Sequence, residues 1–566
     1  MREKNVNRKT RFSFLSRIGV TGLMNLIVNN EKEFNVDYPG VVIESISFND
    51  GTTLALEPNS IVVFTGANNC GKSQILRDVE DCFDDSREKM SVVVSDLSYH
   101  LFGEITQAFL LKNFHINEEG HLEQNGSRSV VHKESLLHEW ERKHLPRDLR
   151  SLFIKRINTE MRLSVSNSLS RDGYGAAAHP IHKMMKSEKL TQTVSGYFHQ
   201  AFGMDLVVNR NMFQTVPLHV GKAPDKTQYT MQDQDEYNAL IDALPQLQEQ
   251  GDGMRSFASI LLDTFTSEYS LTLIDEPEAF LHPPQARIMG KMLGQNNPSS
   301  RQLIVSTHSE DFLQGILDSS NDNVIIVRIN RQDDINWMSI LENEEIEKLW
   351  TNPILRYSNI LSGLFHEMVV VCESDYDCMF YQAVMNALYE SSGEISPDVL
   401  FTHCGGKSRT KDVVSALRAV DVPVVAICDF DLVDSSQDFK SLIEAFGKDW
   451  ESIRSSGLKI VHDSFNAKRG AGVDMHSLIK SAGKACLDGY APAAYENVES
   501  ICKEMGLYIV PCGEMECFDK TINKEKKDWV YHVLEHYNLA TEPKMIEARS
   551  FIRSILSFNQ TSSNIS

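Results

Sequence analysis

Residues 66–73 read Gly-Ala-Asn-Asn-Cys-Gly-Lys-Ser, and this short run constrains the fold more than any other feature of the sequence. It matches the pattern G-x-x-x-x-G-K-[ST], in which backbone N–H groups of a glycine-rich loop and a helix N-terminus surround phosphate groups. The apolar residues 61–64 predict a buried parallel strand before the loop, and a helix is predicted to begin near Lys72. We therefore expect an ATP site formed by Gly66, Asn69, Gly71, Lys72 and Ser73. Lys72 should reach the outer phosphates, and Ser73 should bind Mg²⁺.

Two further strand ends carry residues suited to the same site. The apolar residues 271–274 run into Asp275 and Glu276, and residues 303–306 precede His308. An acid at the carboxyl end of a strand beside a phosphate loop can orient Mg²⁺, which is the role expected of Asp275. Glu276 is then the expected catalytic base for the attacking water. His308 is expected to sense the terminal phosphate.

A second pair of strands also ends in acids. Residues 368–372 run into Glu373, with Asp377 four positions later, and residues 422–428 run into Asp429 and Asp431. Strands of one parallel sheet end at the same edge, so these carboxylates are expected to lie together and to favour hard cations such as Mg²⁺. Two such ions could stabilise the attacking and leaving oxygens of phosphodiester hydrolysis. The alternative is that these acids are solvated strand ends.

Strand and helix patterns alternate along the chain, which predicts an α/β protein with parallel sheets. Two domains are expected, at residues 1–350 and 351–566, with the boundary near residues 345–365. A helical insertion is expected at about residues 135–200. No apolar run is long enough to span a membrane, and no secretory signal is recognisable. A cytoplasmic protein without membrane contact is therefore expected, and its ten cysteines fit a reducing compartment. They contain no Cys-x-x-Cys pair, which disfavours zinc ribbons and thioredoxin-like redox motifs.

The net charge of −22 argues against an indiscriminate nucleic-acid coat, although a local basic patch could still bind DNA. Residues 142–162 contain seven basic side chains against two acidic ones, Asp148 and Glu160. The basic residues are Arg142, Lys143, Arg147, Arg150, Lys155, Arg156 and Arg162. They can form a phosphate-binding surface or a solvated helix face, and the sequence leaves both readings open.

The first half resembles the ABC-type ATPases of DNA repair and chromosome condensation. Residues 273–283 are similar to the Walker B motif and D-loop of those enzymes, and residues 306–309 to their switch histidine. Their signature motif is best matched by residues 250–256, in which Gly251 and Gly253 would present backbone N–H groups to a phosphate. The serine usual in that motif is missing. The resemblance implies a head-to-tail dimer with ATP between the subunits.

The second half resembles a TOPRIM domain, with Glu373 as its strand-end glutamate and Asp429 and Asp431 as its paired aspartates. Ser374 replaces the usual glycine, and Asp377 fits an acid that often follows. Residues 509–516 are similar to a later strand and acid of one TOPRIM branch, which makes Glu516 a candidate metal ligand. In that branch a lysine precedes a tryptophan-containing helix. Lys527 is the expected residue here, with Lys524 and Lys526 as alternatives before Trp529.

An ABC-type ATPase followed by TOPRIM in one chain resembles the OLD (overcoming lysogenization defect) family of nucleases. The resemblance implies an ATP-binding, metal-dependent DNA endonuclease in which ATP gates cleavage. The expected cofactors are ATP and Mg²⁺, with Mn²⁺ as an alternative at the nuclease site. The expected partners are double-stranded or nicked DNA, a homodimer or homotetramer, and a defence-system protein or bound nucleic acid. Family members include anti-phage effectors of the Gabija kind and retron-associated effectors. The alternative function is a non-catalytic, ATP-dependent DNA clamp or sensor.

Overall fold

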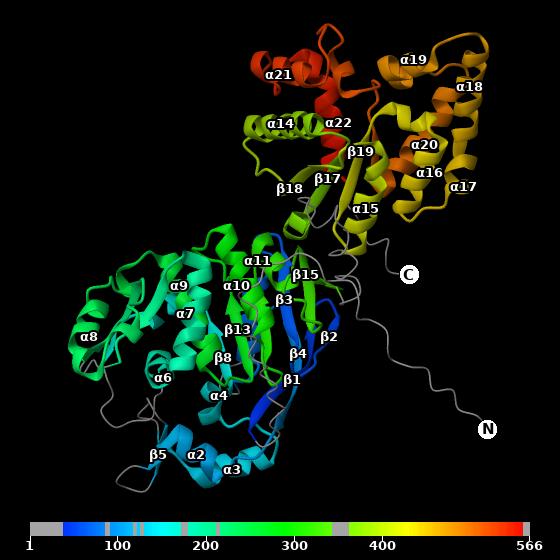
Figure 1. Ribbon diagram of the computed structural model, residues 1–566. Helices are drawn as coiled ribbons and strands as arrows, with labels where there is room; N and C mark the ends of the chain where they lie inside the picture. Colours follow the sequence, from blue (N-terminus) through cyan, green and yellow to red (C-terminus); the bar gives the residue numbers. More distant parts are fainter. Residues whose placement is uncertain are drawn as a thin grey trace, which may run out of the picture.

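The computed structural model describes residues 38–84, 91–116, 121–124, 130–170, 179–210, 215–341 and 361–558. The chain forms two lobes, one from the blue to green segments and one from the yellow-green to red segments of Figure 1. The expected domain boundary at 345–365 falls mostly outside the described residues. The lobes contact each other through β15 (Val324–Gln332) and α11 (Glu310–Leu317) of the first lobe. In the second lobe the contacts are made by the segment before β17 (Met368–Cys372) and by Asp421, which precedes β19 (Val424–Cys428).

A six-stranded mixed sheet forms the centre of the first lobe. Its strands follow the order β16-β15-β3-β14-β13-β8, and only β16 runs antiparallel to its neighbour. The strands are β16 (Ile335–Leu341), β15 (Val324–Gln332), β3 (Ile61–Gly66), β14 (Gln302–Ser306), β13 (Leu271–Asp275) and β8 (Ile154–Ile157). The buried strands expected at 61–64, 271–274 and 303–306 are therefore confirmed.

Alternate residues of the central strand β3 point to opposite faces of the sheet, as the period of a strand requires. Ile61 and Val63 pack in the core that contains α9, α10 and α11, whereas Val62 and Phe64 pack in the core that contains α1 and β1. The sheet is thus covered on both faces, which is typical of parallel strands with continuous apolar sequences. The helices of this lobe are α1 (Lys72–Asp81), α2 (Gln107–Asn113), α3 (Lys133–Glu141), α4 (Arg147–Phe153), α5 (Thr159–Val165), α6 (Pro180–Lys186), α7 (Glu188–Phe202), α8 (Gln234–Asp242), α9 (Asp252–Thr266), α10 (Pro283–Gln295) and α11 (Glu310–Leu317).

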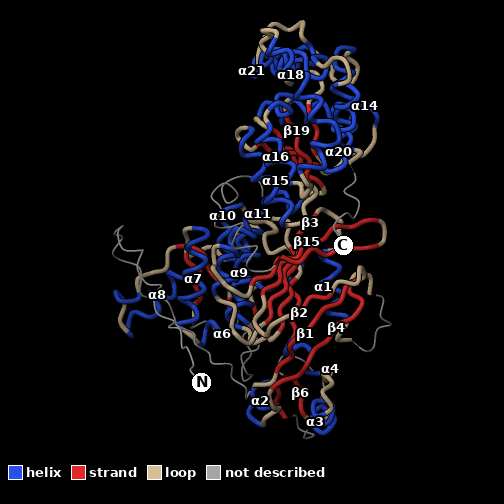
Figure 2. The backbone as a smooth tube through the Cα atoms, turned by 90° about the vertical axis from the view of Figure 1, so that its right-hand side faces the viewer, coloured by secondary structure: helices blue, strands red, loops and turns tan. Residues whose placement is uncertain are grey.

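A separate antiparallel sheet with the order β2-β1-β4 packs against the face that carries α1. Its strands are β2 (Thr53–Ala55), β1 (Gly40–Phe48) and β4 (Val94–Phe102). The remaining short strands of the lobe are β5 (Phe114–Ile116), β6 (Leu122–Gln124), β7 (Val130–Val131), β9 (Leu169–Ser170), β10 (Asp205–Val208), β11 (Thr215–Val216) and β12 (Leu218–Gly221). In the side view of Figure 2, the long strands run through the whole lobe.

The helical insertion expected at about residues 135–200 contains helices and also a strand of the central sheet. Within this range, β8 pairs in parallel with β13 and forms an edge of the central sheet. Its sequence places two charged residues, Lys155 and Arg156, between the isoleucines at its ends, so it lacks the continuous apolar run of the other strands. This strand is therefore part of the central sheet of the first lobe.

The second lobe contains a four-stranded parallel sheet with the order β18-β17-β19-β20. Its strands are β18 (Val399–His403), β17 (Met368–Cys372), β19 (Val424–Cys428) and β20 (Leu507–Ile509), which confirms the strands expected at residues 368–372 and 422–428. The helices are α14 (Asp375–Ser392), α15 (Thr410–Ala419), α16 (Ser436–Ala445), α17 (Trp450–Ile453), α18 (Lys459–Gly470), α19 (Met475–Ala482), α20 (Ala491–Met505), α21 (Lys526–His536) and α22 (Ile546–Leu556). Helices α16 to α20 lie between β19 and β20 in the sequence.

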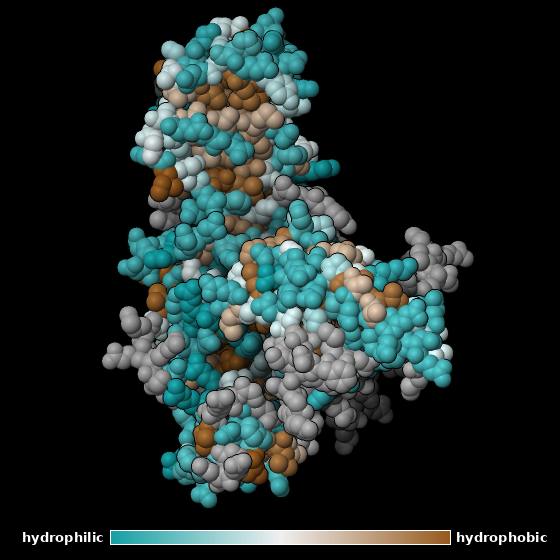
Figure 3. Space-filling view, turned by 90° about the vertical axis from the view of Figure 1, so that its left-hand side faces the viewer, coloured by the Kyte–Doolittle hydropathy of each residue, from teal (hydrophilic) through white to brown (hydrophobic). Residues whose placement is uncertain are grey.

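Both faces of this second sheet are also covered. Val369 and Val371 of β17 pack on the side of α15 and α20, whereas Val370 and Cys372 pack on the side of α14 and α22. Figure 3 shows hydrophilic side chains over most of one face of the molecule, with only small apolar patches. Within the described ranges, we find no helix with the length and apolar character that crossing a lipid bilayer requires.

Candidate active sites

The phosphate-binding loop has the expected position between β3 and α1. Gly71 precedes α1 with a φ of 106°, and a Cβ atom on it would lie 2.8 Å from Nδ2 of Asn336. Asn336 in turn donates a 2.6 Å hydrogen bond to the carbonyl oxygen of Cys70. Glycine is required at position 71 both by the left-handed backbone and by this close contact.

The ammonium group of Lys72 lies inside the loop. Its Nζ donates hydrogen bonds of 2.7 Å to the carbonyl oxygens of Gly66 and Ala67, and the residue is only 3% exposed. Burial lowers the pKa of Lys72, and the nearby charges of Glu276 and Glu278 act in the opposite direction. The ammonium group of Lys72, which is expected to contact the outer phosphates, therefore lies at the phosphate-binding loop.

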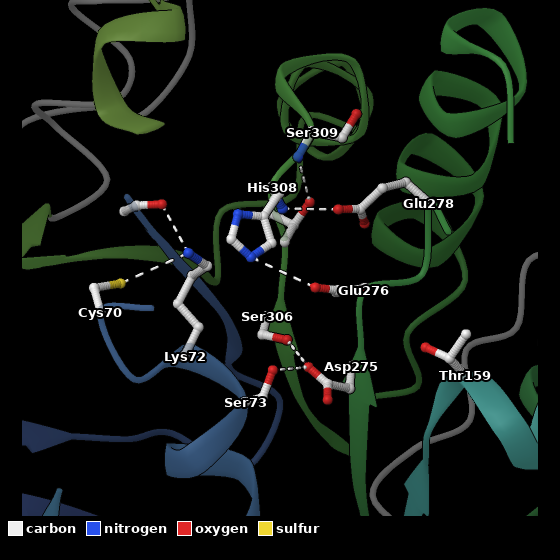
Figure 4. Close-up of polar contacts among 12 residues, drawn as sticks. Cys70, Lys72, Ser73, Thr159, Asp275, Glu276, Glu278, Ser306, His308 and Ser309 are labelled. Atoms are coloured by element: carbon white, nitrogen blue, oxygen red, sulfur yellow. Dashed lines mark hydrogen bonds and ion pairs between the residues drawn. The ribbon is translucent and has the colours of Figure 1, made fainter. Parts of the chain in front are cut away.

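The hydroxyl of Ser73 and the carboxylate of Asp275 meet beside the loop. Ser73 Oγ donates a 2.8 Å hydrogen bond to Asp275 Oδ1, and Ser306 Oγ donates to the same oxygen (Figure 4). Adjacent hydroxyl and carboxylate oxygens are the hard donors that Mg²⁺ prefers. Ser73 and Asp275 thus fit the Mg²⁺ that accompanies a bound nucleotide.

Glu276 and His308 face each other at the same strand edge. Glu276 Oε1 lies 3.5 Å from His308 Nε2, and both side chains are partly exposed. Burial lowers the pKa of His308 to about 4, and the charge of Lys72 acts in the same direction. A neutral imidazole near pH 7 can donate or accept a hydrogen bond, and a contact of His308 with a terminal phosphate stays a prediction.

Glu278 was not among the residues expected in the site, although it lies within the Walker B-like run. Its Oε1 accepts a 2.7 Å hydrogen bond from the backbone N–H of His308, as Figure 4 shows. Burial raises the pKa of Glu278, and the charge of Glu276 adds to that effect. Glu278 therefore fixes the backbone of the switch histidine.

Arg162 also belongs to this site. Its guanidinium donates to the carbonyl oxygens of Glu276 at 2.9 Å and of Asp275 at 3.2 Å. In the sequence, Arg162 is one of a cluster of basic residues, and its place in this site was not predicted. Its partners are backbone atoms more than a hundred positions away. Only the fold brings them together.

The basic cluster is not a single exposed face. Arg150 forms an ion pair with Asp84 at 3.1 Å, Arg156 forms one with Glu80 at 2.6 Å, and Arg162 is fully buried. The paired side chains of Arg150 and Arg156 are 19% and 24% exposed. The phosphate-binding reading is therefore unsupported for these three residues, and the solvated-face reading does not describe them either.

The expected signature glycines lie at the start of α9. Gly251 precedes the helix, and a Cβ atom on Gly253 would lie 2.6 Å from the carbonyl oxygen of Phe280. Phe280 stands in the turn after β13, with a φ of 70°. A side chain at position 253 would therefore clash with that turn. A contact of either glycine with a nucleotide stays a prediction.

A second candidate site lies at the edge of the second sheet. Glu373 and Asp429 follow the adjacent strands β17 and β19, and the backbone N–H of Asp429 donates to Glu373 Oε1 at 3.2 Å. Burial raises the pKa of Glu373 to about 7, and the charge of Asp431 acts in the same direction. Burial also raises the pKa of Asp429 well above its usual range, and the charge of Glu373 acts in the same direction. The fold thus brings these predicted acids together.

The other acids of this region have partners of their own. Asp431 Oδ1 lies 2.8 Å from Lys407 Nζ, and Asp377 accepts from both the N–H and the hydroxyl of Ser374. The Ser374 hydroxyl also accepts from the Asp377 N–H, so the two residues form a capping box at the start of α14. Asp377, expected as a catalytic metal ligand, therefore has a structural role in addition.

Glu516 and Lys527 lie on elements that follow β20. Glu516 Oε1 accepts from the backbone N–H of Lys526 at 2.7 Å. The Nζ atom of Lys527 lies 5.5 Å from the ring centroid of Tyr531, on the same helix α21. The contacts of these residues do not place either side chain on Glu373 or Asp429.

Two lysines that the sequence did not single out lie among the acids. Lys407 pairs with Asp431, and its charge also acts on the pKa of Glu373. Lys480, from α19, lies 2.6 Å from Glu514 Oε1, and the pKa of Lys480 is raised first by that bond and then by the charges of Asp431 and Asp429. Both lysines come from segments far from Glu373 in the sequence, so spacing alone could not identify them.

Carboxylate oxygens are suitable ligands for Mg²⁺ or Mn²⁺, but the acids at this sheet edge do not form a complete set of metal ligands. Throughout the part of the chain that the structure describes, no three His, Cys, Asp or Glu side chains are grouped closely enough to hold a metal ion. Glu373 and Asp429 lie close together, and a metal ion between them stays a prediction. The expected ligands Asp431 and Asp377 are bonded to Lys407 and Ser374.

Comparison with known families identifies part of the first lobe. The family described as "AAA domain, putative AbiEii toxin, Type IV TA system" matches residues 214–313, which include Asp275, Glu276 and His308 but not residues 66–73. A search of curated proteins found no match. The family match, together with the loop and strand-end geometry, shows that the chain contains a P-loop ATPase domain with an α/β fold.

Solved structures of SMC head domains are also similar to part of the chain. A head bound to the C-winged helix domain of ScpA is 12% identical, with a TM-score of 0.30, over 54% of this chain and 99% of that one. A Smc head with an extended coiled coil, bound to the C-terminal domain of ScpA derived from Pyrococcus furiosus, is 11% identical, with a TM-score of 0.31, over 55% and 98%. The SMC head domain from Thermotoga maritima is 10% identical, with a TM-score of 0.30, over 54% and 99%.

Proposed function

We propose that this protein is an ATP-regulated, divalent-metal-dependent DNA endonuclease of the OLD type, with its nuclease site in the second lobe. The observation that carries the proposal is the position of Glu373 and Asp429. They follow neighbouring parallel strands, and the Glu373 carboxylate accepts a hydrogen bond from the Asp429 backbone. Two buried acids with raised pKa values lie at one sheet edge, where the charge of Lys407 compensates them only in part, and a divalent cation would add the remaining positive charge.

Glu373, Asp429 and Asp431 would hold the cation, with Asp377 and Glu516 as further candidate ligands. A bound Mg²⁺ or Mn²⁺ would stabilise the charge that develops on the oxygens during phosphodiester hydrolysis. Lys407, which pairs with Asp431, and Lys480, which pairs with Glu514, would offer ammonium groups to a DNA phosphate. The lysine expected from the sequence, Lys527, instead lies over Tyr531.

ATP would act as a regulator in the first lobe, because hydrolysis of a phosphodiester bond is already favourable. The structure offers direct contacts for this coupling. Glu310 follows His308 by two positions and accepts a hydrogen bond from Ser362, which precedes β17. Arg328 of β15 donates to the carbonyl oxygens of Asp421 and His366 at 3.1 and 2.9 Å. A change at the ATP site can therefore reach the strand that ends at Glu373.

We further propose a homodimer or homotetramer that assembles around ATP, acts on double-stranded or nicked DNA, and serves in anti-phage defence in the cytoplasm. The description of the matched family as a putative toxin of a toxin–antitoxin system supports an activity that must be held in check. A partner protein or a bound nucleic acid would provide that control.

The test is plasmid cleavage by purified protein with Mg²⁺, Mn²⁺ or a chelator, each with no nucleotide, ADP or ATP. The nuclease function predicts metal-dependent cutting by the wild type and none by Asp429→Asn. The wild type and Asp429→Asn should hydrolyse ATP at similar rates. Asp412→Asn, on an exposed position of α15, is the matched control and should cut normally. Equal cutting by Asp429→Asn and the wild type would contradict the assignment of the site.

The second candidate function is an ATP-dependent DNA clamp without nuclease activity. It is favoured by the ion pair of Asp431 with Lys407 and by the incomplete grouping of ligands within the described residues. This function predicts ATP-dependent DNA binding and no cutting by the wild type in any combination of metal and nucleotide.

A further inference from the structure

A buried arginine on α5 contacts the backbone of both acidic residues of the ATP site. Arg162 is 0% exposed, and its Nη1 donates to the Glu276 carbonyl oxygen at 2.9 Å. Its Nη2 donates to the Asp275 carbonyl oxygen at 3.2 Å and to Thr159 Oγ1 at 2.9 Å. A charged guanidinium on backbone carbonyls makes stronger hydrogen bonds than a neutral donor.

The backbone that Arg162 holds is strained. Glu276 has a φ of 48°, a left-handed conformation that is unfavourable for a residue other than glycine. Such a conformation persists only where its surroundings determine it. The N–H of Glu276 donates to the Ser306 carbonyl oxygen at 2.9 Å, and its carbonyl oxygen accepts from Arg162. The backbone N–H and the carbonyl oxygen of Glu276 are therefore both held by hydrogen bonds.

Helix α5 is itself held in place by α9. Ser259 Oγ donates to the carbonyl oxygen of Arg162, and Arg255 Nη2 donates to that of Leu163 at 2.7 Å. These contacts join α9, which begins at Asp252, to α5, and Arg162 then joins α5 to the turn after β13. The same turn packs on Gly253 through Phe280, so α5 and α9 approach it together.

The charge of Arg162 also suits its place. Burial lowers its pKa, and the carboxylates of Glu278, Asp275 and Glu276 oppose that change. A buried cation is tolerated only where hydrogen bonds and opposite charges compensate its loss of hydration. Both Nη atoms of Arg162 are hydrogen-bonded, whereas its Nε has no partner within the described residues, and three carboxylates offset the charge. A neutral side chain at this position would leave two backbone carbonyls and three acids without their cation.

We propose that Arg162 is a positioning residue for ATP hydrolysis: it holds the Asp275–Glu276 backbone so that the Glu276 carboxylate faces His308. This inference rests on the ATPase part of the proposed function and is independent of the nuclease. Glu276 is the residue expected to orient the attacking water. A small displacement of a catalytic group lowers turnover without a comparable loss of substrate binding.

The test measures ATPase kinetics and nucleotide affinity of the full chain for Arg162→Met, Arg162→Lys and Thr159→Val. Arg162→Met should lower kcat by about 10- to 100-fold while KM and nucleotide Kd change less than about threefold. Arg162→Lys keeps the charge but has a single donor group and should recover part of the loss. Thr159→Val keeps Arg162 and removes one of its partners, so it should fold normally and show a smaller loss of kcat.

Arg301 provides a control that is matched in burial. It is also buried, and it donates to the carbonyl oxygens of Tyr269, Thr264 and Ser267, away from the ATP site. Arg301→Lys should lower the melting temperature and leave kcat of the folded protein unchanged.

Unchanged kcat in Arg162→Lys and Thr159→Val would overturn the proposal, as would equal losses of kcat in Arg162→Lys and Arg301→Lys. If Arg162→Met does not fold, the other two variants decide. A wild type that hydrolyses no ATP would overturn the ATPase function together with this inference, whereas normal wild-type turnover with unaffected variants would overturn the inference alone.

Discussion

Ser73 Oγ donates a 2.8 Å hydrogen bond to Asp275 Oδ1, although 202 positions separate the two residues in the sequence. The bond spans the edge of the sheet from the helix after β3 to the end of β13, past the intervening strand β14. It brings the hydroxyl and the carboxylate expected to bind Mg²⁺ into one place. The phosphate loop and the acids of the hydrolytic site are therefore parts of a single site.

Lys72→Met should weaken ATP binding by about 10- to 100-fold, because a charge-assisted hydrogen bond to a phosphate is lost. Titration with a fluorescent ATP analogue measures this. Lys291→Met, at an exposed position of α10, is the control and should bind as the wild type does. Wild-type affinity in Lys72→Met would contradict the assignment of the loop.

Glu276→Gln should retain nucleotide affinity and lower kcat of ATP hydrolysis by about 10²- to 10⁴-fold, because the amide cannot accept a proton from water. Steady-state phosphate release and analogue binding separate the two effects. Hydrolysis equal to that of the wild type would show that another residue activates the water.

Glu373→Gln should change how stability depends on pH. The pKa of Glu373 is about 7 in the folded protein, against an ordinary value of 4.5. Between these values the folded state binds more protons than the unfolded state, so stability falls as pH rises through this range. Without metal, Glu373→Gln should melt at a higher temperature than the wild type at about pH 8, with little difference at about pH 4.

Thermal denaturation in the presence of a chelator measures this effect. Glu367→Gln, at an exposed position just before β17, should show the wild-type pH dependence. Added Mg²⁺ should stabilise the wild type at about pH 8 and leave Glu373→Gln unaffected, since only an ionised Glu373 binds the cation. A pH dependence shared by all three proteins would mean that Glu373 is not a buried acid.

The residues that could be predicted are those whose role depends on local sequence. The phosphate loop, the strand before it and the acids at the ends of β13, β17 and β19 follow from short runs of apolar and polar residues. β8 could not be predicted in this way, because its pairing with β13 is long-range and its centre is Lys155-Arg156.

The supporting cations could not be predicted from spacing at all. Arg162 looked like a member of a basic surface, whereas its partners are backbone atoms of the distant Asp275 and Glu276. Lys480 lies in the helical segment between β19 and β20, and only the return of the chain to Glu514 brings it to the acids. Short sequence patterns identify the acids at the strand ends. The cations that contact these acids or their backbone depend on tertiary contacts.

Arg328→Met should uncouple the two lobes. The variant loses hydrogen bonds to the carbonyl oxygens of Asp421 and His366, which should cost about 1–3 kcal/mol of stability. ATPase activity should persist, and any effect of ATP on DNA cleavage should disappear. Arg331→Met, at an exposed position of the same strand, is the control. An unchanged ATP effect in Arg328→Met would show that the coupling uses another contact.

Lys407→Gln and Lys480→Gln should weaken DNA binding at the nuclease site. Each lysine lies within 3 Å of a carboxylate, at 2.8 Å from Asp431 and 2.6 Å from Glu514. If these ammonium groups also bind phosphates, each substitution should lower the salt slope of DNA binding by about one. If they only neutralise acids, the slope should stay unchanged. Binding is best measured in an Asp429→Asn background, so that the DNA stays intact.

Lys411→Gln and Lys484→Gln are the matched controls, because each lies four positions along the chain from its counterpart and is exposed. They should leave the slope and the cleavage rate as in the wild type. In the cleavage-competent protein, loss of either ammonium group should lower kcat as well as affinity, since the negative charge on the phosphate increases in the transition state. A loss confined to thermal stability would identify the lysines as counter-ions of the acids and would leave phosphate binding to other residues.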